Sequence, residues 1–283
     1  MSPQQQQQQQ RSGYTKAQIS EYFDRLRLPE ERRRYDVAGL EPGDALEYLG
    51  TLQRLHLAEI PFENLTLHYS PHRQICIHAE ELFTKIIGDG NGRGGYCMEN
   101  NGLFGTLLYC QHRQDWRDEV RVVPMPLDRS GAIQKHMQPG AARLEWQNIA
   151  GNTDPDQRLW VYHYRRDERS DFETVYCFSE LEFLPSDYQI MNYYTSTSMR
   201  IFFTRIVVME KKLLADGELV GSLTMNQNTL KWRVHGTKER EIKFESEADR
   251  IRALEEHFGI LLTTTQRDGI EGLPSEIQNG GGA

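Results

Sequence analysis

The chain has 283 residues, 38% of them hydrophobic, which is enough to bury one large core or two to three small ones. Its net charge of -8 argues against non-specific nucleic-acid binding, which requires a basic surface. No run of about 18 to 20 apolar residues is present, and the N-terminus lacks the apolar segment of a signal peptide. We therefore expect a soluble cytoplasmic protein that binds no membrane.

The cysteines point to a reducing compartment. Cys76, Cys97, Cys110 and Cys177 form no Cys-x-x-Cys pair and no Cys/His cluster at zinc spacing. We expect neither a disulfide framework nor a metal site, and sparse free thiols are typical of a reducing environment.

The chain begins with a low-complexity segment. Residues 4–10 are all glutamine, and such a tract lacks the apolar groups that offset the entropy of ordering a chain. We expect disordered tails over 1–13 and 271–283, with the folded body between them.

Helical patterns dominate the first third of the chain. Apolar residues recur at helical spacing over 19–26, after Thr15 as a candidate N-cap, and again over 46–57. A further helix is expected over 97–109, directly after a glycine-rich stretch at 91–95.

This arrangement places Cys97 near a helix N-terminus, where unpaired N–H groups favour a thiolate. Arg93 would add positive charge, and Gly94 and Gly95 permit close backbone approach or supply amide donors to an oxyanion. On these features alone, a buried structural cysteine after an ordinary turn is the stronger interpretation.

The later part of the chain is β-rich. Strands are expected over 159–164, 175–178 and 203–209, with a turn at Gly217. Apolar residues at helical spacing over 251–258, followed by Gly259, predict a closing helix.

Three ordered segments resemble signatures of the arylamine N-acetyltransferases. Residues 93–101 read Arg-Gly-Gly-Tyr-Cys-Met-Glu-Asn-Asn and resemble the family's nucleophile motif, while 60–65 resemble its other N-terminal signature. Residues 187–198 and Phe203 are similar to the family's segment of Asp, Asn and a Thr/Ser-rich turn ending in Phe. Residues 199–202 depart from that segment, where many members have Pro and Ser.

The resemblance implies an α+β fold in three parts: a helical domain over 14–110, a central β-barrel over 111–200 and a C-terminal α/β lid over 201–270. It also implies a triad of Cys, His and Asp arranged as in cysteine proteases. Cys97 would take an acetyl group from acetyl-CoA and pass it to the nitrogen of an arylamine or arylhydrazine.

The resemblance places coenzyme contacts at Tyr194, Thr195, Ser196 and Thr197, and it implies no metal. Without it, this Thr/Ser-rich segment reads simply as a turn.

The other residues of the resembling segments have structural interpretations. Glu63 and Asn64 fit a buried polar turn that holds the first domain to the second. Phe62, Tyr96 and Phe203 fit core aromatics better than substrate platforms, although aromatic substrates need an apolar wall.

The histidine and aspartate of the triad have no counterpart in the expected place. In the family they precede a Pro-x-Pro-Leu-like stretch, which here occupies 123–127, shortly after Cys110. Residues 111–122 contain His112 and Asp115 but neither the histidine strand nor the aspartate turn. We therefore expect a barrel that lacks several strands, through loss of function, a splice variant or a faulty gene model.

Two histidines are conceivable replacements. His136 and Asp154 keep the order Cys, His, Asp, but their contexts are a loop and a polar turn, so we expect a loop role for His136. His112 follows the nucleophile helix and would lie roughly 20 Å from its start, because a helix rises about 1.5 Å per residue.

Three functions remain open. The first is acetyl transfer through Cys97, and the second is an inactive relative that keeps the fold and binds CoA or a partner. A cysteine hydrolase ranks last because it needs the same missing base.

Overall fold

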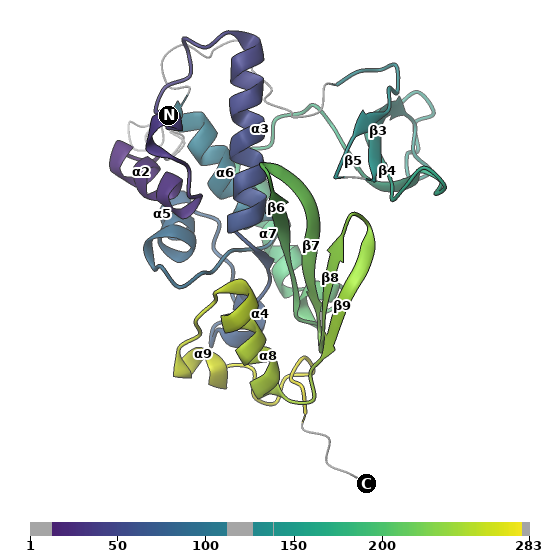
Figure 1. Cartoon of the computed structure of the whole chain (residues 1–283). Coiled ribbons are helices and arrows are strands. Elements are labelled where there is room, and N and C mark those ends of the chain that lie inside the picture. The colour runs from purple at the N-terminus through teal and green to yellow at the C-terminus, as the bar shows by residue number, and fades with distance from the viewer. Residues whose placement is uncertain (1–12, 112–126, 138, 279–283) are drawn as a thin grey trace, which may run out of the picture.

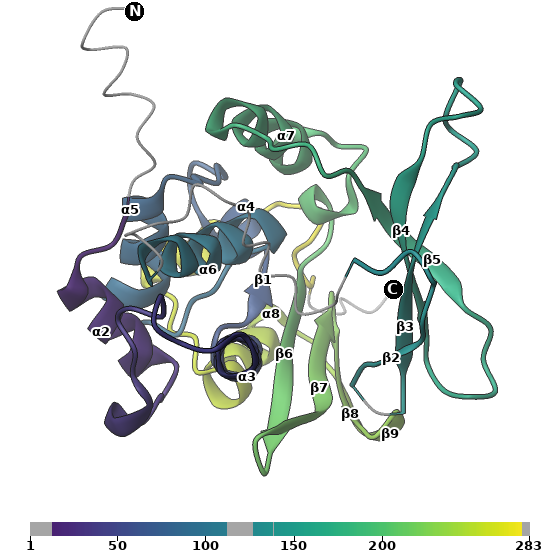
Figure 2. The same ribbon diagram turned by 90° about the horizontal axis from the view of Figure 1, so that it is seen from above.

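The computed structural model describes residues 13–111, 127–137 and 139–278, and it shows an α+β fold (Figure 1). Helices from the first third of the chain lie on one side of a five-stranded sheet, and a four-stranded sheet lies on the other side (Figures 1 and 2). Among the described residues no helix is long and apolar enough to cross a membrane.

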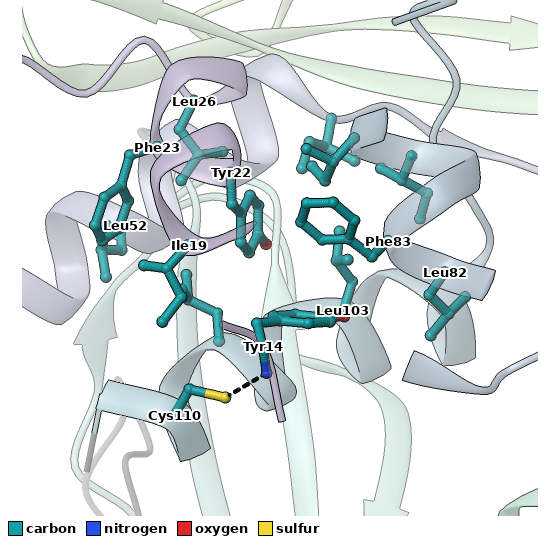
Figure 3. Packing of buried hydrophobic residues seen from close by; sticks show 14 of the residues in the cluster. Tyr14, Ile19, Tyr22, Phe23, Leu26, Leu52, Leu82, Phe83, Leu103 and Cys110 are labelled. Carbon is teal, nitrogen blue, oxygen red and sulfur yellow. Dashed lines mark hydrogen bonds between the residues drawn. The ribbon is translucent and has the colours of Figure 1, made fainter. Parts of the chain in front are cut away.

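Most helices of the first third pack around one apolar core, whereas Leu67 and Tyr69 of the short helix Thr66–Tyr69 belong to two other clusters. The bounds of the helices in this third are α2 Lys16–Arg25, η1 Glu30–Arg32, α3 Pro42–Glu59, α4 Thr66–Tyr69, α5 Ala79–Phe83, η2 Thr84–Gly88 and α6 Cys97–Gln111. The expected cap at Thr15 is confirmed, because Thr15 and Gln18 form a reciprocal capping box. Tyr22, Phe23 and Leu103 are fully buried in this core (Figure 3).

Cys110 belongs to the same core. Its sulfur accepts a hydrogen bond from the Tyr14 backbone N–H at 2.9 Å, which ties the end of α6 to the start of the folded chain (Figure 3). This cysteine therefore has a structural role.

The five-stranded sheet joins the two ends of the chain. Its order is β1-β6-β7-β8-β9, all antiparallel, with bounds β1 Phe62–Glu63, β6 Val208–Ala215, β7 Glu218–Asn226, β8 Thr229–Val234 and β9 Thr237–Lys243. The expected turn at Gly217 links β6 to β7, with a φ of 78° that favours glycine. Because β1 pairs with β6, the first and last thirds of the chain share one sheet, although the sequence suggested separate domains.

The C-terminal helices pack beside this sheet. They are α8 Glu247–Ala253, η4 Leu254–Phe258 and α9 Thr264–Asp268. The expected helix over 251–258 is confirmed, and Gly259 ends it in the left-handed conformation. The expected tail from 271 is ordered as far as 278: Ser275 is 1% exposed and its hydroxyl contacts His68 Nδ1 at 2.8 Å.

The strand expected over 203–209 begins only at Val208, after a short helix η3 at Phe202–Thr204. The side-chain amide of Asn64 donates to the backbone carbonyls of Phe203 and Ile206, both at 2.8 Å. These bonds hold residues 203–206 beside Asn64, just before the start of α4. The two carbonyls are thereby satisfied by the Asn64 amide and do not take part in the hydrogen bonds of the sheet.

The four-stranded sheet has the order β2-β3-β4-β5 and is antiparallel. Its bounds are β2 Gln134–Lys135, β3 Ala141–Gln147, β4 Leu159–Arg165 and β5 Glu173–Phe178, and helix α7, Pro185–Thr197, follows it. The strands expected over 159–164 and 175–178 are therefore confirmed.

The two sheets do not close into a barrel within the described residues. Each sheet has two outer strands, β1 and β9 in one and β2 and β5 in the other, and no ladder joins the sheets. The expectation of a central barrel is corrected to two open sheets, since closure requires edge strands to pair with each other.

Candidate functional site

Cys97 is the first residue of α6 and is exposed to solvent. Tyr96 precedes it, and the Tyr96 backbone N–H donates to the Glu99 carboxylate at 3.0 Å. Glu99 thus reaches back over the first turn as the third residue of a capping box does, which fixes where the helix begins. The expected helix N-terminus at Cys97 is confirmed.

The glycines before Cys97 allow the loop to lie against β1. Glu63 N–H donates to the Gly95 carbonyl at 3.0 Å, and Gly95 N–H donates to the Pro61 carbonyl at 3.3 Å. A Cβ at Gly94 would lie 1.9 Å from the Pro61 oxygen, so only glycine fits there. Close backbone approach is therefore the role of Gly94.

Buried charges hold this loop in place. Arg93 Nε donates to Glu63 Oε1 at 2.9 Å, and Lys85 Nζ lies 2.7 Å from Glu99 Oε1 and 3.6 Å from Glu63 Oε1. Glu63, Arg93 and Glu99 are each less than 5% exposed. Burial alone would raise the pKa of Glu63, but Arg93 and Lys85 outweigh it and hold the pKa below its ordinary value.

This network changes the role expected for Arg93. Its guanidinium pairs with Glu63 and also donates to the Thr66 hydroxyl at 3.0 Å. The charge of Arg93 is thus used in holding β1 and α4 to the loop. The sequence did not predict the roles of Lys85 and Glu99. A signal existed only for Glu99, which lies three residues after Tyr96, the spacing of a capping box.

The surroundings of Cys97 disfavour its thiolate. Burial raises the pKa of the Cys97 thiol, and the Glu99 carboxylate raises it further, while the N–H groups of Cys97 and Met98 lower it. The helix N-terminus therefore acts in the expected direction but is outweighed.

No histidine within the described ranges is hydrogen-bonded to the Cys97 sulfur. His136 is exposed in a loop, as expected, and its ring meets the Tyr164 ring edge-on at 5.0 Å. It follows β2 in the four-stranded sheet, which lies across the five-stranded sheet from α6 (Figures 1 and 2). Asp154 lies in a turn before β4. His112 and Asp115 lie outside the described residues.

An aromatic cluster lies beside the nucleophile loop. The Phe203 ring is 5.8 Å from the Phe62 ring and 6.0 Å from the Tyr96 ring. Tyr96 is fully buried, and its hydroxyl donates to the Asn192 side-chain oxygen on α7. The expectation of core aromatics holds for Tyr96, while Phe62 and Phe203 are half-buried.

The four predicted coenzyme contacts lie in the last turn of α7, where the sequence suggested a turn. Ser196 is buried and its hydroxyl donates to the Asn192 carbonyl at 2.7 Å, while the Thr197 hydroxyl donates to the Tyr193 carbonyl at 2.6 Å. Both hydroxyl protons are therefore used in hydrogen bonds to backbone carbonyls of α7.

The side-chain oxygen of Asn100, one turn after Cys97, is buried and makes no hydrogen bond in the part of the chain that the structure describes. Its amide donates to the Pro61 carbonyl at 3.3 Å. In the same part of the chain no group of His, Cys, Asp and Glu side chains could hold a metal ion.

Comparison with known proteins identifies the family. A family model described as N-acetyltransferase matches residues 45–111, the segment from α3 to the end of α6. The N-malonyltransferase FDB2 of Fusarium pseudograminearum is 30% identical over 321 aligned positions, which cover 91% of this chain and 92% of the relative. The chain belongs to the arylamine N-acetyltransferase family. The members of this family are acyltransferases.

Solved structures of arylamine N-acetyltransferases share the fold. The enzyme from Mycobacterium abscessus superposes with a TM-score of 0.67 at 18% identity, covering 89% of this chain and 93% of that chain. The enzyme from Mycobacterium marinum in complex with CoA superposes with a TM-score of 0.65 at 19% identity, covering 90% and 99%. The 321 aligned positions with the Fusarium relative exceed the 283 residues of this chain, so that relative has residues without a counterpart here.

Proposed function

We propose that this chain transfers an acyl group from an acyl-CoA to the nitrogen of an arylamine or arylhydrazine, with Cys97 as the acyl carrier. The observation that carries the proposal is the position of Cys97, an exposed residue that begins α6 and follows a loop fixed by buried ion pairs. A nucleophile that the fold already orients reacts faster, because part of the entropic cost of positioning it is met before the substrate binds.

The chemistry proceeds in two steps. The Cys97 thiolate attacks the thioester carbonyl, the oxyanion collapses, and the CoA thiolate leaves. The amine nitrogen then attacks the new thioester, loses its proton to solvent water and expels the thiolate of Cys97. The N–H groups of Cys97 and Met98 already lower the pKa of the sulfur, so they favour its anionic form before attack and after release.

Acetyl-CoA is the donor that we propose first. The CoA complex of the Mycobacterium marinum enzyme supports an acyl-CoA donor, and the N-malonyltransferase relative makes malonyl-CoA the alternative to compare. The hydroxyls of Ser196 and Thr197 donate to carbonyls of α7, whereas the hydroxyls of Tyr194 and Thr195 make no hydrogen bond within this helix. We therefore place the contact chiefly on these two side chains.

A family member without turnover is the second candidate. Three observations favour it: the raised pKa of Cys97, the lack of an imidazole bonded to it within the described ranges, and the extra residues of the Fusarium relative. Without a base the thiol stays protonated near neutral pH, which slows acyl transfer by orders of magnitude.

Intact-mass spectrometry separates the two candidates. The protein is mixed with acetyl-CoA or malonyl-CoA, alongside Cys97→Ala and the matched variant Cys177→Ala, which removes another exposed thiol. An adduct of one acyl group that Cys97→Ala lacks, that Cys177→Ala keeps and that an arylamine discharges would establish the acyltransferase. A folded protein without any adduct from either donor would instead identify a relative without turnover.

A further inference from the structure

Two arginines lie close together on one face of the four-stranded sheet. Arg143 on β3 pairs with His163 on β4, and Arg165 lies two residues further along β4, so all three side chains project from the same face. Such diagonal neighbours have their Cβ atoms about 7 to 8 Å apart, within reach of long side chains. The two positive charges therefore repel each other unless a negative charge lies between them.

The ring of Phe172, the residue before β5, holds both guanidinium groups. The central carbon of the Arg143 guanidinium lies 4.5 Å from the ring centre, and that of Arg165 lies 4.9 Å from it. A cation is attracted to the face of an aromatic ring, so these contacts keep the two groups beside one ring. The side chains are thus arranged before any ligand arrives, which lowers the entropic cost of binding one.

The ion pairs of this face leave one guanidinium without a counter-charge. Glu145 Oε1 lies 3.1 Å from Arg143 Nη2, and Glu145 Oε2 lies 3.1 Å from His163 Nε2. The half-buried Arg165 side chain forms no ion pair and no hydrogen bond within the described ranges. One carboxylate therefore faces two guanidinium groups, and the cluster has a net positive charge.

Both arginines also have a buried donor without an acceptor. Nε of Arg143 and Nε of Arg165 make no hydrogen bond in the part of the chain that the structure describes, and only one other buried side-chain atom there, Asn100 Oδ1, shares this property. Unpaired buried donors are destabilising, and in folded proteins they often mark the place of a bound water or ion. The Arg143 side chain is 32% exposed, so this part of the sheet is open to solvent.

We propose that Arg143 and Arg165 bind a phosphate group on this face of the sheet. A phosphate is tetrahedral and can accept hydrogen bonds from two guanidinium groups that belong to different strands, whereas the planar carboxylate matches a single guanidinium. Its negative charge offsets the repulsion between the two arginines, and its oxygens supply acceptors for the Nε–H donors.

The phosphate site is separate from the nucleophile. The four-stranded sheet lies across the five-stranded sheet from α6, which begins with Cys97 (Figures 1 and 2). The proposal therefore does not depend on acyl transfer. The phosphate is either the free ion or a phosphate monoester of a larger molecule, such as the ribose phosphate of CoA.

A titration of the full chain with inorganic phosphate, followed by phosphorus NMR, tests the proposal. The wild type should bind one phosphate per chain in a saturable manner. Arg143→Met and Arg165→Met should each weaken binding at least about tenfold, because each removes charge-assisted hydrogen bonds. Arg166→Met is the matched control: it removes the same charge at the neighbouring exposed position and should leave the affinity unchanged.

A conservative variant protects the test against a failure to fold. Arg165→Lys keeps the charge and the apolar stem but lacks Nε, so it should fold like the wild type and still bind phosphate severalfold more weakly. Thermal melts of every variant check that the chain is folded.

The source of the phosphate is identified by comparing CoA with dephospho-CoA, which lacks only the ribose phosphate. Tighter binding of CoA that Arg165→Met abolishes would support the site with the coenzyme as the source. Equal binding of the two, together with saturable binding of inorganic phosphate, would support it with the free ion as the source. A wild type that neither binds phosphate in a saturable manner nor prefers CoA overturns the proposal. Binding that both methionine variants leave unchanged, or that Arg166→Met weakens equally, overturns it as well.

Discussion

At the level of single residues, the protonation state of the Cys97 thiol determines whether this chain can catalyse acyl transfer. The described residues raise its pKa through burial and the Glu99 carboxylate. Acyl transfer that relies on this thiol alone should therefore become faster with rising pH, because the thiolate is the nucleophile.

Alkylation of Cys97 by iodoacetamide should be slow at neutral pH and still increasing above the ordinary cysteine pKa of about 8.5. Replacing Glu99 by glutamine should move this profile to lower pH, because a neighbouring negative charge is removed. Peptide-resolved mass spectrometry of labelling at a series of pH values measures both profiles, with N-acetylcysteine as the reference. A rate that is already constant at pH 7 would contradict the prediction and reveal a base outside the described residues.

The Glu63–Arg93 pair should be worth far more to stability than a surface pair. Arg93→Met removes the hydrogen-bonded charged partner of a fully buried carboxylate and leaves it only the charge of Lys85 at 3.6 Å, and breaking a buried pair typically costs about 3 to 5 kcal/mol. Urea denaturation measures the loss. Lys238→Met, which breaks an exposed pair with Glu241, should change the midpoint little. A small effect of Arg93→Met would mean that water reaches Glu63.

At the scale of elements, the contact between β1 and the 93–97 loop positions the nucleophile. Gly94→Ala places a Cβ 1.9 Å from the Pro61 carbonyl oxygen, and forcing the two segments apart should cost at least about 1 to 3 kcal/mol. Gly43→Ala is the matched control, because its Cβ would meet nothing within 4 Å in the first turn of α3, and alanine favours a helix by up to about 1 kcal/mol. Thermal melts of both variants check the prediction, and equal stability of the two would refute the close contact.

Helix α7 shows where reading elements from the sequence fails. Its hydroxyl-rich end, 194–198, suggested a turn, yet it is helical to Thr197 and two of its hydroxyls donate to its own carbonyls. The exposure of its apolar residues follows from Asn192, whose side chain bonds to Tyr96 and to Ile75 from distant parts of the chain. The apolar periodicity of a helix reports only its own residues, so it cannot predict these contacts with Tyr96 and Ile75.

At the scale of the whole molecule, two buried histidines couple stability to pH. Burial, with a smaller contribution from Arg25 at His56 and from Arg250 at His68, lowers the pKa of both histidines to about 4. Nε2 of His68 lies 3.0 Å from the Phe203 carbonyl, which can only accept, so this nitrogen carries the proton. Both rings are therefore neutral in the folded protein.

Stability should fall as the pH drops from about 6.5 to about 4. The unfolded chain binds protons on these histidines from about pH 6.5, whereas the folded chain binds them only near pH 4. The contribution of the two neutral histidines to the free energy of unfolding is thus fully present above pH 6.5. By pH 4 the loss should be on the order of 2 to 4 kcal/mol for each histidine. Urea denaturation at pH 7.5 and pH 5 measures the loss. His56→Gln should reduce the pH dependence, while the exposed His72→Gln should not; an unchanged slope in His56→Gln would contradict the assignment.

The amino-acid sequence by itself determined the local elements: the capped helix at Thr15, the helix from Cys97, most strands, the glycine turns, and through its motifs the family. These depend on periodicity, capping and backbone freedom, which act over a few neighbouring residues. Only the tertiary structure decided that β1 pairs with β6, that the sheets stay open, and that Arg93 neutralises Glu63 and leaves the Cys97 thiol without its charge. Those outcomes depend on desolvation and on partners far apart in the chain, and no local pattern encodes them.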